Sequence, residues 1–300
     1  MRIVRSPAEL EGAERAVAIG TFDGVHRGHR AAIETAVGAG LRSTVVTFTP
    51  HPRTVLGYEV RLISSLERRI ELIEAIGPDE LVVLEFTPEL ASREAEEFIG
   101  DVLEPLGTRV IAATQDFRFG RGRHGDLDLL KAHGLQVAEV APVEGVSSSR
   151  IRELLVEGDV AAAATLLGRP PEVEGRVVSG DQRGGTLGFP TANLSPPPEL
   201  LVPAHGIYAG AARIFSPPPA PERGHHHRVA LSIGVNPHYG GRERRVEAFL
   251  LDFTGDLYGE ELRIELWDRL REERAFASEE ELVEQIGRDV EAARAASRPG

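Results

Sequence analysis

Short apolar runs alternate with helical patterns along residues 16–167, and this alternation restricts the possible folds more than any other feature of the sequence. Repeated strand–helix–strand units build a parallel sheet covered by helices. Groups that bind or react lie beyond the carboxyl ends of the strands in such a sheet. The residues that follow each run are therefore the first candidates for a site. The runs are Val17–Ile19, Thr44–Phe48, Leu81–Phe86, Val110–Ala113 and Val137–Val143.

Helix signals stand between these runs. Ser64–Glu67 has the spacing of a capping box, in which side chains bond the free N–H groups of the first turn. Apolar residues then recur near a period of 3.6, and Gly77-Pro78 ends the pattern. This predicts a helix that is capped at Ser64 and ends by Ile76.

The pattern changes from about Glu172, where strand-like runs are separated by Gly, Pro, Asn and Asp. One further helix is expected after Ser278, whose spacing to Glu281 is again that of a capping box. We therefore predict two domains, residues 1–167 with a Rossmann-like parallel sheet and residues 168–300 with a β-barrel closed by a C-terminal helix. The later runs are Arg176–Ser179, Gly206–Phe215, Val229–Ile233, Val246–Phe253 and Leu262–Trp267.

The composition excludes several classes of protein. The 300 residues contain no Cys, which excludes disulfides and thiolate metal sites and is compatible with a reducing cytoplasm. No apolar stretch approaches the roughly 18 residues of a membrane span. The net charge of −13 argues against a sequence-independent nucleic-acid binder. Lys131 is the only lysine, so phosphate chemistry would depend on Arg, His, backbone N–H groups or a metal.

Gly20–His29 directly follows the first predicted strand and opens the first helix. Its glycines let the backbone approach a ligand, and the unpaired N–H groups of the helix N-terminus favour an anion. His26 and His29 are three residues apart and share one helix face. The segment predicts a phosphate site, with two alternatives: solvent-facing histidines, or a metal site in which His51 supplies the third ligand.

Gly20–His29 resembles the nucleotidylyltransferase signature of bacterial bifunctional riboflavin kinase/FMN adenylyltransferases, the prokaryotic FAD synthetases. The resemblance continues in Thr47–Pro52, Asp116–Gly120 and Ser147–Arg152, which follow the second, fourth and fifth predicted strands. It implies that ATP and FMN both bind at this edge of the sheet, where the adenylyl group is transferred from ATP to FMN. The residues that it implies for ATP are Gly20, Thr21, Phe22, His26, Gly28, His29, Ser148, Ser149 and Arg152, and those for FMN are Phe48, Pro50, His51, Pro52, Asp116, Phe117 and Arg118.

Arg118, Arg121, Arg123 and His124 form a basic island in this acidic chain. The island fits a position near the FMN phosphate. A solvated Arg-rich turn is the alternative for Arg121 and Arg123.

Gly180–Asn193 resembles the riboflavin kinase signature, whose most specific part is Gly188-Phe189-Pro190-Thr191-Ala192-Asn193. A glycine-rich loop lets main-chain N–H groups approach phosphates. The Thr191 hydroxyl and the Asn193 carbonyl are oxygen ligands of the kind that Mg²⁺ accepts. A plain glycine turn between strands is the alternative for the glycines. The resemblance implies that ATP binds through Gly180, Gly188, Pro190, Thr191 and Asn193, and that Thr191 and Asn193 also bind Mg²⁺.

Phosphorylation of an alcohol requires the loss of a proton, so a base is expected. Glu247 shares one face of its predicted strand with Phe249, Leu251 and Phe253. Such a carboxylate either meets water at the end of the sheet or lines a pocket, and the resemblance implies the second, with Glu247 as the base. It also implies that Arg271 and Glu273 bind the flavin.

Four places depart from the family pattern: Thr114, Gly185, His238 and the pair Ala248-Phe249. None removes a proposed catalytic group, so they bear on rates. The resemblance implies an enzyme that converts riboflavin to FMN and FMN to FAD with ATP and Mg²⁺. Two rivals are an adenylyltransferase for another phosphorylated substrate and a non-catalytic flavin or nucleotide binder. We expect a cytoplasmic monomer or weak homo-oligomer whose partners are small molecules, with no nucleic acid and no membrane.

Overall fold

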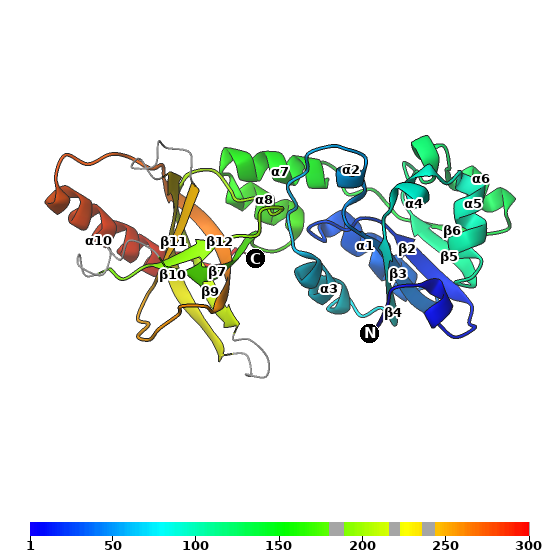
Figure 1. Cartoon of the computed structure of the whole chain (residues 1–300), viewed down its shortest axis with the longest axis horizontal. Helices are drawn as coiled ribbons and strands as arrows, with labels where there is room; N and C mark the ends of the chain where they lie inside the picture. The colour runs from blue at the N-terminus through cyan, green and yellow to red at the C-terminus, as the bar shows by residue number, and fades with distance from the viewer. Residues whose placement is uncertain (180–188, 216–222, 236–243, 300) are drawn as a thin grey trace. The chain divides into compact units, whose positions relative to one another are not determined.

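The computed structural model describes residues 1–179, 189–215, 223–235 and 244–299, and the chain packs into two compact units, residues 1–148 and 149–300 (Figure 1). The unit boundary lies about twenty residues before the predicted domain boundary, because helices α7 (Ser148–Glu157) and α8 (Val160–Leu167) pack with the second unit. Helix α8 contacts a barrel strand, and the Ala204 N–H donates to the carbonyl of Leu155 at 3.0 Å. The division after Leu167 stays a prediction about where the two functional domains separate.

The first unit is a six-stranded parallel sheet with the order β1-β4-β3-β2-β5-β6. All five predicted strands are present, and the sixth, β1, is a three-residue edge strand that sequence analysis missed. The predicted fifth strand ends four residues early, at Glu139, and Pro142 in the remainder of the predicted run has no N–H to donate to a neighbour. The strands are β1 (Arg2–Val4), β2 (Arg15–Ile19), β3 (Arg42–Thr49), β4 (Glu80–Glu85), β5 (Thr108–Ala113) and β6 (Gln136–Glu139).

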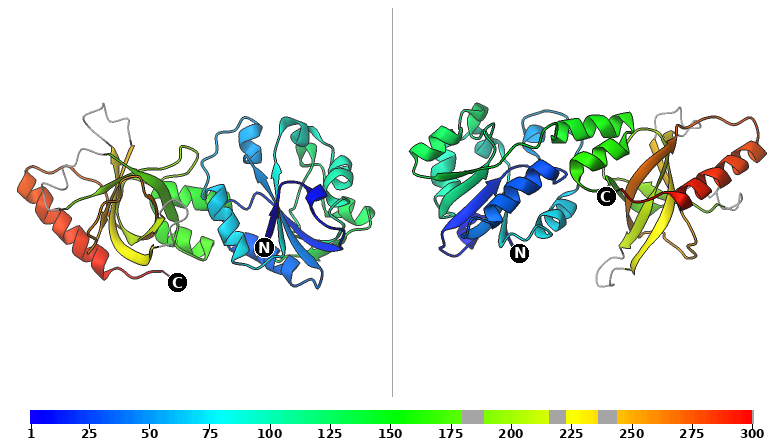
Figure 2. Two further views of the ribbon diagram at one scale, coloured as in Figure 1. Left: turned by 60° about the horizontal axis from the view of Figure 1, so that its bottom comes forward. Right: turned by 180° about the vertical axis from the view of Figure 1, so that it is seen from behind.

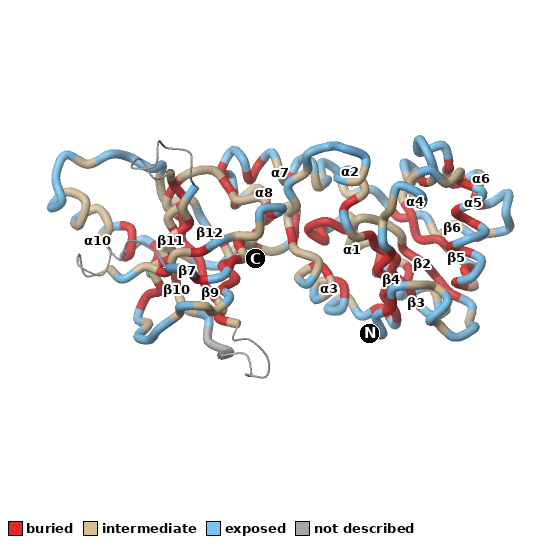
Figure 3. Tube along the Cα trace, viewed as in Figure 1, coloured by how far each residue is buried: buried red, intermediate tan, exposed pale blue. Residues whose placement is uncertain are grey.

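Both faces of this sheet are buried, as the central strands in Figure 3 show. Alternate strand residues point to opposite faces, so Ala16 and Ala18 pack with α1 and α3, whereas Val17 packs with α5 and α6. The predicted helix is α3, whose N-cap is Ser65 instead of Ser64 and which ends two residues earlier than expected. The helices are α1 (Arg27–Val37), α2 (Pro52–Val55), α3 (Leu66–Glu74), α4 (Pro88–Ser92), α5 (Ala95–Phe98) and α6 (Leu127–Ala132), with a π-helical turn at Ile99–Leu103 and short 3₁₀ turns at Pro7–Glu9 and Arg121–Arg123.

The second unit is a closed antiparallel barrel with the order β10-β11-β8-β7-β12-β9, and the left view of Figure 2 shows its strands closing around the interior. This confirms the predicted barrel. Helix α10 (Glu279–Ala295) packs on it and begins at the predicted Ser278, whose hydroxyl accepts the Glu281 N–H at 3.2 Å. The strands are β7 (Glu172–Val178), β8 (Ala192–Ser195), β9 (Gly206–Phe215), β10 (Arg223–Val235), β11 (Arg244–Leu250) and β12 (Glu261–Arg271).

One barrel strand was not predicted, and the others differ from the prediction in their bounds; β10, for example, begins at Arg223 instead of Val229. Strand β8, four residues long, was missed because it lies inside the glycine-rich motif. Strand β11 ends at Leu250 instead of Phe253, since Asp252 takes a left-handed φ of 57° that extended backbone does not allow. Leu251 and Phe253 therefore do not continue the strand face that carries Glu247.

Candidate active sites

The loop between β2 and α1 forms the centre of the first candidate site. His26 is the N-cap of α1, and its Nδ1 accepts the backbone N–H of His29 at 3.2 Å. The two imidazoles are stacked with centroids 3.5 Å apart, and Phe22 meets the His29 ring edge-on at 5.2 Å. His26 is buried and His29 is half-buried. The predicted pair is therefore held together at the carboxyl end of β2, beside the amide groups of a helix N-terminus.

The loop itself is fixed by contacts to the segment before α3. The buried Asp23 carboxylate accepts the N–H groups of Ile63 at 2.9 Å and Ser64 at 3.2 Å. Gly24 has a φ of 78°, and a Cβ on it would lie 2.9 Å from the Ile63 side chain. Glycine is therefore required here both for conformation and for space. Phe22 and Val25 are also left-handed, with φ values of 48° and 39°. Backbone in these sparsely populated conformations is stable only where surrounding contacts hold it in place, and it occurs often at functional sites.

Ser148 reaches this loop. Its hydroxyl donates to the carbonyl of Asp23 at 3.1 Å, so one predicted nucleotide-binding serine contacts the predicted phosphate loop. Ser149 and Arg152 follow in α7 and belong to the second unit, where Ser149 is exposed and Arg152 is half-buried. Their predicted contacts to ATP stay predictions.

The segment after β3, predicted to bind FMN, is joined to the loop after β2. The Thr47 hydroxyl donates to the carbonyl of Thr21 at 3.1 Å. Phe48 packs edge-on against Phe86 at 5.6 Å. The buried His51 is the N-cap of α2, with Nδ1 accepting the N–H of Arg53 at 3.2 Å, and it follows a cis peptide bond between Thr49 and Pro50.

The segment after β5 is more open. Asp116 and Arg118 are exposed, and the Arg118 guanidinium donates to the carbonyls of Gln115 and Phe117. The Thr114 hydroxyl, at a position that departs from the family pattern, donates to the Asp116 carboxylate. Phe117 stacks on Phe119 with centroids 5.7 Å apart.

The basic island divides into residues with different surroundings. Arg121 forms an ion pair with Glu94, and its N–H donates to the carbonyl of Arg93 at 2.7 Å. Arg123 is exposed and adopts a left-handed φ of 63°. Arg121 therefore has a local structural role. The metal alternative gains no support, because no cluster of three or more His, Asp or Glu that would suit a metal ion occurs among the residues that the structure describes.

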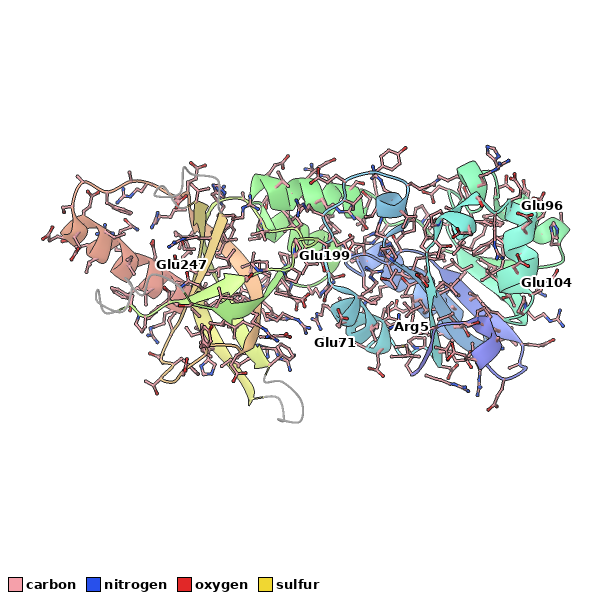
Figure 4. All side chains as sticks on the ribbon, viewed as in Figure 1. Arg5, Glu71, Glu96, Glu104, Glu199 and Glu247 are labelled. Carbon is pink, nitrogen blue, oxygen red and sulfur yellow. The ribbon has the colours of Figure 1, made fainter. Side chains whose placement is uncertain are left out.

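The second candidate site lies on the barrel, where β8 and β11 pair. Asn193 stands directly opposite Glu247 in this pairing, and Ser232 of β10 stands opposite Glu247 on its other side. Residues directly opposite one another in antiparallel strands project to the same face. Strand pairing therefore brings together a predicted metal ligand and the predicted base, residues that are 54 positions apart in the sequence (Figure 4 labels Glu247).

The face that carries Glu247 is the half-exposed one. Val246, Ala248 and Leu250 point into the barrel core, whereas the Glu247 side chain is 32% exposed. Phe249 lies on the Glu247 face and meets Phe189 edge-on at 5.5 Å, which places the residue before Pro190 against β11. Thr191 immediately precedes β8 and is half-buried. The hard oxygen donors of Thr191 and Asn193 fit Mg²⁺ by their chemistry.

One neighbour of Glu247, Arg245, was missed in the sequence. An Arg245 nitrogen lies 3.6 Å from a Glu247 carboxylate oxygen, and Gly234 stands opposite Arg245 in β10. A Cβ on Gly234 would overlap a Glu273 carboxylate oxygen, so Glu273 lies against this strand. Arg245 lies two residues before Glu247, so the alternation of side chains between the two faces of β11 could have identified it. That Ser232 and Gly234 stand opposite Glu247 and Arg245 could not be predicted, because it depends on the register between β10 and β11.

Arg271, predicted to contact the flavin, is held by α10. Its Nε and Nη2 donate to the buried Asp289 carboxylate at 3.0 and 2.7 Å, and its guanidinium lies 5.7 Å from the centre of the Phe276 ring. The flavin contact stays a prediction. Gly180, Gly185, Gly188 and His238 lie outside the described residues. In the described part of the chain, no helix combines the length and the apolar character that crossing a membrane requires.

Comparisons with known proteins agree with this architecture. A family model described as FAD synthetase matches residues 9–152, and one described as riboflavin kinase matches residues 167–297. The fold and sites thus define a class of two-domain proteins in which an adenylyltransferase-type sheet precedes a kinase-type barrel.

Relatives of nearly full length specify the family. A bifunctional riboflavin kinase/FMN adenylyltransferase of Bacillus subtilis (strain 168) is 36% identical over 300 residues, covering 94% of this chain and 92% of the relative. The protein of that description from Escherichia coli (strain K12) is 33% identical over 312 residues, covering 98% and 97%. A solved structure described as a macrolide-efflux protein from Streptococcus pneumoniae has a TM-score of 0.88 and 31% identity, covering 98% of this chain and 99% of that one. The chain belongs to the bifunctional riboflavin kinase/FMN adenylyltransferase family.

Proposed function

We propose that this chain makes FAD in two steps, phosphorylation of riboflavin by ATP at the barrel and transfer of the adenylyl group of a second ATP to FMN at the parallel sheet. The observation that carries the proposal is the pairing of Asn193 with Glu247 on one half-exposed face of the barrel. It supplies a metal ligand and a base at neighbouring positions, as transfer to an alcohol requires.

In the kinase step, Glu247 accepts the proton of the riboflavin 5′-hydroxyl. The resulting oxygen attacks the γ-phosphorus of ATP, the bond from that phosphorus to the β–γ bridging oxygen breaks, and ADP leaves. Bound to Thr191 and Asn193, Mg²⁺ would neutralise phosphate charge. Arg271 and Glu273 would orient the flavin, and Arg271 is already held in place by Asp289.

In the adenylyltransferase step, an FMN phosphate oxygen attacks the α-phosphorus of ATP and pyrophosphate leaves. This nucleophile is already anionic, so positioning and charge stabilisation replace a base. The stacked His26 and His29 at the N-terminus of α1 would contact the ATP phosphates. Ser148, Ser149 and Arg152 would hold the triphosphate, and the segments Phe48–Pro52 and Asp116–Arg118 would bind FMN.

Chromatography of flavins tests the proposal directly. The full chain is incubated with riboflavin, ATP and MgCl₂, and the products are separated by HPLC. We expect FMN to appear first and FAD to follow. Absence of FMN formation together with FAD synthesis from supplied FMN would leave a single-activity adenylyltransferase, and absence of both products would leave a non-catalytic binder. Cytoplasmic location, a monomeric or weakly associated state and the lack of a nucleic-acid partner stay predictions.

A further inference from the structure

Arg69 on α3 is a buried cation, and it is not among the residues predicted to form either site. Its side chain is 2% exposed. Nη1 donates to the carbonyl of Phe48 at 3.1 Å and lies 3.5 Å from the Thr47 hydroxyl oxygen. Both acceptors are neutral, and both belong to the carboxyl end of β3, where the predicted FMN segment begins.

Burial of this guanidinium is costly. Desolvation lowers the pKa of Arg69, and the charges of Asp23 and Glu67 act in the opposite direction. Within the described part of the chain, the buried Nε has no hydrogen-bond partner. A buried charge held mainly by neutral groups contributes little to stability, and an apolar residue of similar volume often serves the fold as well or better. Arg69 therefore calls for a functional explanation.

The hydrogen bonds of Arg69 continue into the predicted nucleotide loop. Thr47 accepts from Arg69 and donates its own proton to the carbonyl of Thr21 at 3.1 Å. Thr21 and Phe48 stand at the carboxyl ends of β2 and β3, which are paired in the sheet. One chain of donors and acceptors thus connects α3 with the segment predicted for FMN and the segment predicted for ATP.

We propose that Arg69 is a positioning residue for adenylyl transfer, which holds the carboxyl end of β3 against the loop after β2 so that the two substrates meet in line. This inference rests on the proposed function of the first unit. Reaction between two bound substrates depends steeply on their alignment, and a displacement of about 1 Å costs about 100-fold in rate.

The test uses steady-state FAD formation from supplied FMN and ATP by the full chain. For Arg69→Met we expect kcat to fall about 10- to 100-fold while the KM values for ATP and FMN change less than about threefold. Arg69→Lys keeps the charge and a donor and should recover most of the kcat. Thr47→Val removes the hydroxyl link at constant shape and should lower kcat in the same way.

Controls separate positioning from folding. Arg68→Met alters the neighbouring residue of α3, which pairs with the exposed Glu71, and should leave kcat unchanged. Riboflavin phosphorylation and the thermal unfolding midpoint should be unchanged in all variants. If Arg69→Met does not fold, Thr47→Val decides the question.

Three results would overturn the inference: an unchanged kcat in both Arg69→Met and Thr47→Val, a raised KM with unchanged kcat, or a loss of activity that matches a loss of folded protein. Each of these leaves the proposed function intact as long as the wild-type chain forms FAD. A wild-type chain that forms no FAD from FMN and ATP refutes the proposed adenylyltransferase function and this inference with it.

Discussion

Replacement of Glu247 by Gln removes the proposed base of the kinase site and keeps its shape. A carboxamide cannot accept the riboflavin proton at neutral pH. General-base catalysis contributes about 10²- to 10⁴-fold, so we expect kcat for riboflavin phosphorylation to fall by that factor, equivalent to about 3–5 kcal/mol of activation free energy. FAD formation from supplied FMN should be unchanged, because it occurs in the other unit.

The structure predicts that this loss is not one of folding. Glu247 is 32% exposed and its partner Arg245 is 28% exposed, at an N–O distance of 3.6 Å. Ion pairs with this exposure contribute about 1 kcal/mol or less. The midpoint of thermal unfolding should therefore fall by less than about 4 °C, which differential scanning calorimetry can resolve.

A matched control is available on the same barrel. Glu261 of β12 pairs with Arg176 at 3.5 Å, and both side chains are more than 60% exposed. Glu261→Gln makes the same chemical change on a strand that is separated from β11 by β8 and β7, and it should leave both activities at the wild-type level. Wild-type riboflavin phosphorylation by Glu247→Gln would refute the assignment of the base. Loss of both activities in a folded protein would contradict the independence of the two sites.

Three further predictions concern the other groups. His29→Ala should lower FAD formation about 100-fold and let FMN accumulate from riboflavin, and undiminished FAD in the HPLC assay would remove this histidine from the mechanism. Glu80→Gln should lower the free energy of unfolding, measured in urea, by about 3–5 kcal/mol. The reason is that Arg15, which is 1% exposed and lies 2.7 Å from the Glu80 carboxylate, would lose its charged partner. A decrease below about 1 kcal/mol would contradict this. Burial opposes ionisation of Glu80, but hydrogen bonds from Arg15 and Thr44 outweigh it and lower its pKa from 4.5. Its contribution is therefore present above pH 4.5 and lost as the pH falls through the lower folded-state pKa, so the difference in unfolding free energy between wild type and Glu80→Gln should shrink in acid. Thr191→Val should raise the MgCl₂ concentration required for half-maximal phosphorylation, and an unchanged requirement would exclude this hydroxyl as a ligand.

Local patterns in the sequence were sufficient for most of the elements. Strand–helix alternation identified every strand of the parallel sheet except β1. Cap signals placed the start of α10 at Ser278 and that of α3 at Ser64, one residue before its actual N-cap, Ser65. These features depend on neighbours in the chain, since caps and periodicity act over a few residues. The short strands β1 and β8 were not predicted from the sequence, because it is pairing with neighbouring strands, and not a pattern in their own residues, that makes them strands.

The sequence by itself determined the two-part architecture, the motifs at the carboxyl ends of the strands and the types of residue available for each reaction. Tertiary structure alone decided which side chains come into contact. It places Asn193 opposite Glu247 and Glu273 against Gly234, and it pairs Arg271 with Asp289. It also buries Arg69 at the carbonyl of Phe48. Motifs are local and are read along the chain. Strand register and the burial of a charge depend on segments that are distant in the chain, and they exist only once the chain has folded.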